Sequence, residues 1–325
     1  MSRLKVFITG QIPLVGVDLL KPHFDVEIYS QSKAIPRNLL LEKVQHIDGL
    51  LCILRDKIDR ELMDAAPRLK TISQYAVGYN NIDVDYATQK RILITNTPGV
   101  LTDATADLTW ALLLAITRRV VEGDKTMRRG EFKEFDPLFM LGGDLAGKTL
   151  GIIGAGRIGT AVAERSAGWK MKILYYNHSR NPQLETKLNA AKVDLQTLLS
   201  KSDFVSIHLP LTAETHHLIG HKELSLMKST AYLINTSRGP LIHETALVKA
   251  LQDQQITGAG LDVFEHEPQI AKGLGDLENV VLTPHIGSAT ITARNKMAEI
   301  AAQNIVNWHF KKEPVYIVNS EVRGN

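Results

Sequence analysis

The stretch from Thr149 to Gly159 restricts what this chain can fold into more than any other part of its sequence. Its apolar residues predict a buried strand that runs into a glycine-rich turn and a helix, and Met171–Tyr176 predicts the next strand of a βαβ unit. Gly154, Gly156 and Gly159 fit G-x-G-x-x-G, in which the glycines permit a tight turn, the approach of a pyrophosphate and close packing of helix on strand. A turn that only joins strand to helix is the alternative, but the apolar context favours a dinucleotide site at the start of the helix.

Upstream of this stretch, short apolar runs alternate with amphipathic segments, which is typical of an α/β unit with a mostly parallel sheet. We expect strands at 4–8, 26–29, 49–54, 71–75 and 92–95, and helices at 15–20, 39–44, 60–65 and 84–89. This unit has no glycine fingerprint of its own, so it is not expected to bind a second nucleotide.

The length of 325 residues suggests about two domains. The turn Asn96–Gly99 ends the first unit, and Leu101–Arg119 predicts one long helix that crosses into a second α/β unit. The run Pro314–Val318 is expected to return to the first unit. We therefore predict a two-domain α/β fold, with a Rossmann-type dinucleotide-binding domain (101–289) inserted into a flavodoxin-like domain (1–100 and 290–325).

Composition argues against several classes of function. The formal net charge is +3 and the basic residues form no block, so no nucleic-acid partner is expected. Cys52 is the single cysteine, which leaves no intrachain disulfide and gives no sign of an oxidising compartment. The longest apolar run, Trp110–Ile116, is too short to span a bilayer, and Met1–Ile8 predicts a strand rather than a signal peptide. We expect a cytoplasmic protein without a membrane partner.

Three segments at predicted strand ends each place one ionisable group beside a turn: Arg238, Glu267 and His285. The carboxyl ends of parallel strands face the ligand crevice of an open sheet, so these groups should converge. With a nicotinamide cofactor, they form the set needed to reduce a 2-oxo acid: Arg binds the carboxylate, His gives the proton, and the acid keeps His protonated. Each alone has an ordinary alternative, namely a surface ion pair, a solvated carboxylate and a hydrogen-bonded loop residue.

The motifs of this chain, and their order along it, resemble those of the D-2-hydroxyacid dehydrogenase family. They are the glycine fingerprint, Asn235–Gly239, Glu267–Pro268 and Pro284–Ser288, and Val77–Gly78 and Leu101–Asp107 also match. The resemblance covers nearly the whole chain and implies an NAD(P)-dependent oxidoreductase, with the flavodoxin-like domain as its substrate domain. Within the family, glyoxylate/hydroxypyruvate reductases are most similar, which implies small 2-oxo acids as substrates and the D-2-hydroxyacid as product.

The resemblance also implies roles for single residues. Arg238 would bind the carboxylate and carbonyl of the substrate, His285 would be the acid and base, and Glu267 would be its partner. Asp262 would meet the nicotinamide carboxamide. The implied substrate contacts are Val77, Gly78 and Ser288, and the implied cofactor contacts are Gly154, Gly156, Arg157, Ile158, Gly159, Leu209, Pro210, Thr236 and Asp262.

The end of the second βαβ strand bears on the choice of dinucleotide. An NAD-specific site normally has an acidic residue there, which binds the ribose hydroxyls. This chain has Asn177, followed by Ser179 and Arg180, and these side chains are suited to a 2′-phosphate. We predict that NADP(H) is preferred, with NAD(H) also accepted if Arg180 is only a solvated loop residue.

The segment Gly123–Gly147 is less regular and contains Asp136–Met140, which resembles the aromatic intersubunit loop of the glyoxylate/hydroxypyruvate reductases. It predicts a homodimer, and docking of the segment on its own chain is the alternative. No metal site is predicted from His216–His217 or from Glu265–Glu267, because neighbouring side chains tend to point apart and no spaced ligand set completes one.

Other functions stay open. A 2-ketogluconate reductase would share the motifs, as would a phosphoglycerate dehydrogenase, although many of the latter carry an added regulatory domain, which is not expected in a chain that stops at Asn325. A formate dehydrogenase is disfavoured, because that branch has Gln where this chain has Glu267. Some relatives are NAD(P)-sensing, partner-binding proteins such as corepressors, but no long tail or low-complexity arm points to that role.

Overall fold

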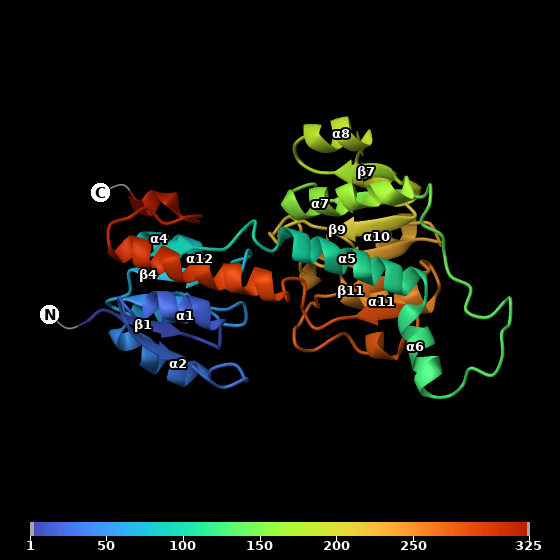
Figure 1. Cartoon of the computed structure of the whole chain (residues 1–325). Coiled ribbons are helices and arrows are strands. Elements are labelled where there is room, and N and C mark those ends of the chain that lie inside the picture. Colours follow the sequence, from blue (N-terminus) through green and yellow to red (C-terminus); the bar gives the residue numbers. More distant parts are fainter. Residues whose placement is uncertain (1–2, 324–325) are drawn as a thin grey trace. The chain divides into compact units, whose positions relative to one another are not determined.

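The computed structural model describes residues 3–323. They form two compact units, one of residues 3–101 with 288–323 and the other of residues 102–287. Each unit consists of a parallel β-sheet with helices packed on it (Figure 1). The substrate-binding and dinucleotide-binding roles expected for two domains stay predictions.

The sheet of the first unit contains β1 (Lys5–Ile8), β2 (Asp25–Ile28), β3 (Gly49–Cys52), β4 (Thr71–Gln74) and β5 (Leu93–Thr95). Its strands are parallel and lie in the order β2-β1-β3-β4-β5, which is that of flavodoxin-like folds. Every residue of β3 and β4 is buried, as expected for parallel strands that are covered on both faces.

The helices of this unit are α1 (Leu14–Leu20), α2 (Arg37–Lys43), α3 (Arg60–Asp64), α4 (Val84–Gln89) and α12 (Ile291–His309). α1 and α12 lie side by side, and α12 packs on β3 and β4 (Figure 1). The hydroxyl of Ser73 on β4 donates to the carbonyl of Ala301 on α12 at 2.8 Å. Leu50 and Ile72 point to the other face, because side chains alternate along a strand, and there they share a core with α2, α3 and α4.

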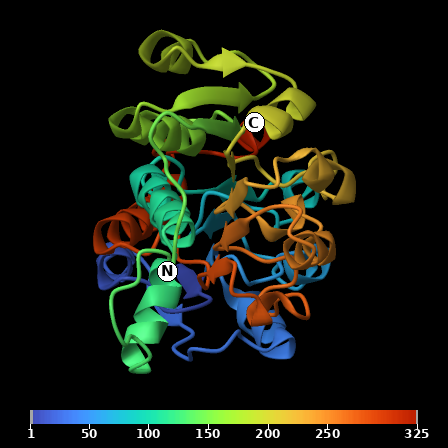
Figure 2. The same ribbon diagram turned by 90° about the vertical axis from the view of Figure 1, so that its right-hand side faces the viewer.

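The second unit has a parallel sheet of β6 (Thr149–Ile153), β7 (Lys172–Tyr176), β8 (Ala191–Lys192), β9 (Phe204–Ile207), β10 (Tyr232–Asn235), β11 (Gly258–Leu261) and β12 (Val280–Leu282). The strands lie in the order β12-β11-β10-β9-β6-β7-β8, from the orange β11 side to the lime-coloured β7 side in Figures 1 and 2. Counted from β6, this is the Rossmann order with β12 added at one edge. The predicted fold class, a Rossmann domain inserted in a flavodoxin-like domain, is confirmed.

The helices of the second unit are α5 (Thr102–Thr117), α6 (Val120–Arg128), α7 (Arg157–Arg165), α8 (Pro182–Leu188), α9 (Leu195–Lys201), α10 (His221–Leu226) and α11 (Glu244–Gln252). α5 packs on α7, and Trp110 stacks on Trp169 with ring centroids 4.5 Å apart. The helix predicted at 101–119 is α5, which ends two residues earlier, at Thr117; Arg119, with a left-handed φ of 53°, separates it from α6, which runs into a segment expected to be irregular. Within residues 3–323, no helix is long and apolar enough to cross a membrane.

Candidate active site

His285 and Glu267 form a hydrogen-bonded pair in the loops that follow β12 and β11. Nδ1 of His285 lies 2.8 Å from Oε2 of Glu267. The other carboxylate oxygen, Oε1, accepts a hydrogen bond from the backbone N–H of Phe264 at 3.1 Å. Burial raises the pKa of Glu267, but the hydrogen bond and charge of His285 outweigh burial, so this pKa lies below its ordinary value. Glu267 is therefore a carboxylate that is oriented at the imidazole.

The buried carboxylate of Asp262 holds the turn that carries His285. Its Oδ1 accepts from the Thr283 hydroxyl at 2.6 Å and from the N–H of Ile286 at 2.8 Å, and its Oδ2 accepts from the N–H of Gly287 at 2.8 Å. His285 has a left-handed φ of 54°, which non-glycine residues rarely adopt. Asp262 therefore acts as a positioning residue for a strained turn. Its predicted contact with the nicotinamide stays a prediction.

Arg238 lies in the loop after β10 and is partly buried. The side-chain amide of Asn235, at the end of β10, donates to the carbonyl of Arg238 at 2.9 Å. A Cβ on Gly239 would lie 1.9 Å from the carbonyl carbon of Phe264, so only glycine lets the two backbone segments pass this close. Burial lowers the pKa of Arg238, and the negative charge of Glu267 acts in the opposite direction. The loop thus brings a guanidinium under the electrostatic influence of the Glu267 carboxylate.

The glycine turn has the geometry of a backbone anion site. Gly154 has φ of 97°, and a Cβ there would lie 2.7 Å from the carbonyl carbon of His208. A Cβ on Gly159 would lie 2.0 Å from the carbonyl oxygen of Gly154, so the third glycine lets α7 pack on the turn. A Cβ on Gly156, which precedes α7, would meet no described atom within 4 Å. The start of α7 is therefore open to a phosphate.

The remaining predicted cofactor residues lie in the same unit. The hydroxyl of Thr236 lies 2.8 Å from that of Thr109 on α5. The carbonyl of Leu209 accepts a hydrogen bond from the hydroxyl of Ser237. The first contact joins the segment after β10 to α5, and the second joins it to the segment after β9. Arg157 and Ile158 are the first two residues of α7, and Leu209 and Pro210 follow β9 closely.

After β7, the structure gives Arg180 a partner that the sequence did not reveal. Nη2 of Arg180 lies 2.8 Å from Oε2 of Glu185 on α8, and the hydroxyl of Tyr175 donates to the same carboxylate. The amide of Asn177 donates to the carbonyl of Ser179 at 3.1 Å. Arg180 is 75 % exposed, so it can also reach a ligand in solvent.

A cavity of about 780 Å³ lies beside these residues, within the usual size of a ligand pocket. Asn177 and Leu209 line it, together with Lys192. The carboxylates of Asp194 and Glu214 also line it, and their negative charges would repel a phosphate bound close to them.

Val77, Gly78 and Ser288 belong to the first unit. The side chains of Asn96 and Gln74 hold the carbonyls of Val77 and Gly78, at 2.7 and 3.2 Å. The carbonyl of Ser288 accepts from the N–H of Thr290 at 2.9 Å and from the guanidinium of Arg294 at 3.3 Å. The loop after β4 and the start of the returning segment are thus both fixed by side chains.

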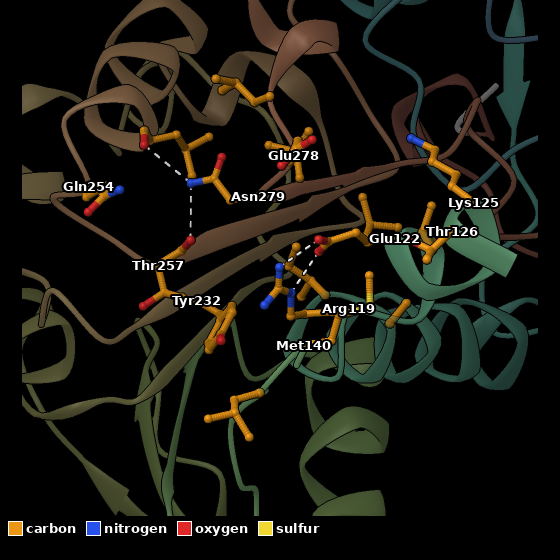
Figure 3. A pocket seen from close by; sticks show the side chains of 18 of the residues that line it. Arg119, Glu122, Lys125, Thr126, Met140, Tyr232, Gln254, Thr257, Glu278 and Asn279 are labelled. Atoms are coloured by element: carbon orange, nitrogen blue, oxygen red, sulfur yellow. Dashed lines mark hydrogen bonds and ion pairs between the residues drawn. The ribbon is translucent and has the colours of Figure 1, made fainter. Parts of the chain in front are cut away.

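A larger cavity of about 1100 Å³ lies at the opposite edge of the Rossmann sheet (Figure 3). Tyr232, Thr257 and Asn279 line it at or just before the amino ends of β10, β11 and β12, and an ion pair of Arg119 and Glu122 at 2.6 Å lies on its wall. None of the predicted catalytic or cofactor residues is among the described residues that line it. This cavity is therefore not the candidate active site.

One expectation about neighbouring histidines was wrong. The rings of His216 and His217 do not point apart, since their centroids are only 3.9 Å apart. The sequence could not show this, because it depends on the left-handed φ of 53° at His217.

The fold agrees with that of known proteins. Residues 110–287 match the family model described as D-isomer specific 2-hydroxyacid dehydrogenase, NAD binding domain. The chain is 53 % identical to the glyoxylate reductase of Thermococcus litoralis, over 98 % of this chain and 97 % of that protein. The structure of the TT0316 protein from Thermus thermophilus superimposes with a TM-score of 0.92 at 43 % identity, covering 97 % of this chain and 100 % of that one.

A further solved structure is that of the NADPH-dependent glyoxylate/hydroxypyruvate reductase from Sinorhizobium meliloti, in complex with NADP and malonate. It has a TM-score of 0.85 at 30 % identity and covers 99 % of this chain and 98 % of that one. The chain therefore belongs to the D-isomer-specific 2-hydroxyacid dehydrogenases. It is a nicotinamide-dependent oxidoreductase, as the sequence predicted.

Proposed function

We propose that this dehydrogenase reduces small 2-oxo acids, with glyoxylate and hydroxypyruvate as its best substrates. The product is the 2-hydroxyacid, with D configuration where the carbon is chiral. The observation that carries the proposal is the hydrogen bond of 2.8 Å between His285 and Glu267. Arg238 is close enough for the negative charge of Glu267 to act on its pKa. The names of the Thermococcus litoralis and Sinorhizobium meliloti relatives support the choice of substrate.

In the proposed reaction, the guanidinium of Arg238 binds the carboxylate and carbonyl of the substrate. Nδ1 of His285 faces Glu267, so Nε2 is the ring nitrogen that gives a proton to the carbonyl oxygen. Glu267 stabilises the imidazolium before the transfer. The N–H groups of Val77 and Gly78 would also bind the substrate carboxylate, and Ser288 would border the substrate. A bound nicotinamide dinucleotide supplies the hydride to the carbonyl carbon.

The dinucleotide would be held by the glycine turn and the start of α7, with Asp262, Thr236, Leu209 and Pro210 along it. The open space at Gly156 supports this, because a pyrophosphate needs a backbone without an obstructing side chain. We infer a preference for NADP(H) from the uncharged Asn177 and the exposed Arg180. Glu185 competes for this arginine, so the 2′-phosphate has to displace an existing ion pair.

We also infer a homodimer formed through the segment 131–141. Phe135 and Leu138 are 83 and 77 % exposed, which is unusual for large apolar side chains. Phe139 and Leu141 continue this surface along the wall of the larger cavity. Light scattering would show a dimer, and Phe135→Asp with Leu138→Asp would shift it towards a monomer. The expected cytoplasmic location stays a prediction.

A substrate panel tests the proposed function. NADPH consumption is followed with glyoxylate, hydroxypyruvate, pyruvate, 2-ketogluconate and phenylpyruvate. We expect the highest kcat/KM with glyoxylate or hydroxypyruvate. A maximum with 2-ketogluconate or phenylpyruvate would assign another dehydrogenase activity, and dinucleotide binding without turnover of any of the acids would favour a sensor.

A further inference from the structure

Three potential metal ligands converge in the second unit, apart from the His285–Glu267 pair. His216, His217 and Glu265 each offer one ligand atom, and these atoms lie within 4.8 Å of one another. No other group of three His, Cys, Asp or Glu side chains meets in this way in the part of the chain that the structure describes. His217 and Glu265 are already in contact, with 2.6 Å between Nε2 and Oε1.

The backbone builds this cluster from separate loops. The N–H of His217 donates to the carbonyl of Pro240 at 2.8 Å, which fixes the loop after β9 against the loop after β10. Oε2 of Glu265 accepts from the N–H of Glu244 at 3.1 Å, so its Oε1 is turned to His217. Metal ligands are commonly oriented by such hydrogen bonds on their other polar atom.

The carboxylate of Glu265 suits a cation. Burial raises the pKa of Glu265, but the N–H of Glu244 and the contact with His217 outweigh burial, so this pKa lies below its ordinary value. The ring of His243 adds a third imidazole, 4.7 Å from that of His217, and its Nδ1 accepts from the N–H of Ala246 at 3.2 Å. Because a neutral imidazole that accepts at Nδ1 carries its proton on Nε2, His243 borders the site and is not one of the proposed ligands.

We propose that His216, His217 and Glu265 bind a divalent transition-metal ion of the zinc type. Two imidazoles and one carboxylate, with a fourth position for water, are a ligand set that zinc uses in proteins. Metal–ligand bonds of about 2.0–2.2 Å place tetrahedral ligand atoms about 3.3 Å apart. The His217–Glu265 contact would widen by about 0.7 Å, and the widest pair would close by about 1.5 Å, changes within reach of side-chain rotation.

The ion would take the place of the proton between Nε2 of His217 and Oε1 of Glu265, and a neutral imidazole would then carry its proton on Nδ1. The ion would also join three segments of the catalytic region. Glu265 lies two residues before Glu267, Pro240 lies two residues after Arg238, and His217 lies in the same loop between β9 and α10 as Leu209. The site therefore has a stabilising role for these loops.

The alternative is that His217 and Glu265 form only a hydrogen bond, with His216 as a bystander. This alternative gives no role to His216, whose ring lies on that of His217. The two accounts differ in the effect of His216→Ala, which leaves the His217–Glu265 contact in place. A loss of metal affinity in His216→Ala is therefore expected only if His216 is a ligand.

The test uses the untagged full-length chain, stripped with a chelator and desalted, and Co²⁺ or Zn²⁺ alone as the probe. We expect one Co²⁺ per chain with the visible absorption of a four- or five-coordinate site, displacement by Zn²⁺, and a higher Tm with Zn²⁺. His216→Ala and Glu265→Gln should each weaken binding at least about tenfold, since even the loss of a ligand's hydrogen-bond partner costs that much. His46→Ala, at an exposed position in the first unit, is the matched control and should bind as wild type.

Two results would overturn the proposal. One is an absence of stoichiometric binding to the wild-type chain, or binding that survives both His216→Ala and Glu265→Gln. The other is binding that survives these changes only in part and is lost in His285→Ala, which would place the ion at the catalytic pair instead.

Discussion

Glu267 reaches His285 through only one of its carboxylate oxygens, Oε2, at 2.8 Å from Nδ1. The other oxygen is held by the N–H of Phe264. The carboxylate therefore cannot rotate away from the imidazole without breaking a backbone hydrogen bond. This arrangement gives the proton donor a fixed direction, with Nε2 as the end that meets a substrate.

Glu267→Gln tests the charge of this pair and largely preserves its shape. We expect kcat for reduction to fall about 10- to 100-fold, as for the loss of a hydrogen bond to a charged group. Steady-state kinetics of variant and wild type with glyoxylate measure this effect, and a wild-type kcat in Glu267→Gln would contradict the assigned role.

Arg238→Ala removes the proposed carboxylate clamp. We expect KM for glyoxylate to rise about 10- to 100-fold, together with a loss in kcat, because charged hydrogen bonds to the substrate disappear. Arg238→Lys keeps the charge but not the planar fork, so it should recover only part of the loss. Steady-state kinetics of both variants decide this, and a wild-type KM in Arg238→Ala would remove Arg238 from the substrate site.

The cofactor preference can be tested by changing either partner of the ion pair between Arg180 and Glu185. Arg180→Ala should weaken NADPH about tenfold and leave NADH nearly unchanged. Glu185→Gln should strengthen NADPH a few-fold, since it frees the guanidinium, and Asn177→Asp should shift the preference to NADH. Fluorescence titration with both dinucleotides gives the constants. Equal losses for NADPH and NADH in Arg180→Ala would show that no 2′-phosphate contact exists.

His208 predicts how stability depends on pH. Burial lowers its pKa to about 3, below the value near 6.5 expected in the unfolded chain. The unfolded state therefore binds more protons between these values, so the stability contribution is complete above pH 6.5 and is lost as the pH falls towards 3. Since the ring keeps some exposure, we expect a loss of about 1 kcal/mol between about pH 6.5 and pH 5.

His208→Gln can keep the contact with the hydroxyl of Ser206, 2.8 Å away in wild type, but it does not titrate. Thermal unfolding at both pH values should show a smaller pH dependence in this variant. An equal slope in variant and wild type would show that other groups cause the loss.

Much of this architecture could be predicted from local patterns. The alternation of apolar runs predicted the five strands of the first sheet and β6 and β7 of the second, and the three glycines located the turn at Gly154, but the short strand β8 was not predicted. Features set by tertiary geometry could not be predicted. The Arg180–Glu185 pair depends on how α8 begins, and the close rings of His216 and His217 depend on a left-handed backbone. The hydrogen bonds of Asp262 to its turn likewise join segments that are distant in sequence.

The most direct test of the account is the turnover of His285→Ala with glyoxylate and NADPH. We expect kcat to fall by about two to four orders of magnitude, the range of general acid catalysis, with the dissociation constant of NADPH within about twofold of wild type. His46→Ala should keep wild-type turnover. A His285→Ala enzyme that reduces glyoxylate at a near-normal rate would contradict the assignment of His285 as the proton donor, and with it the proposed reaction.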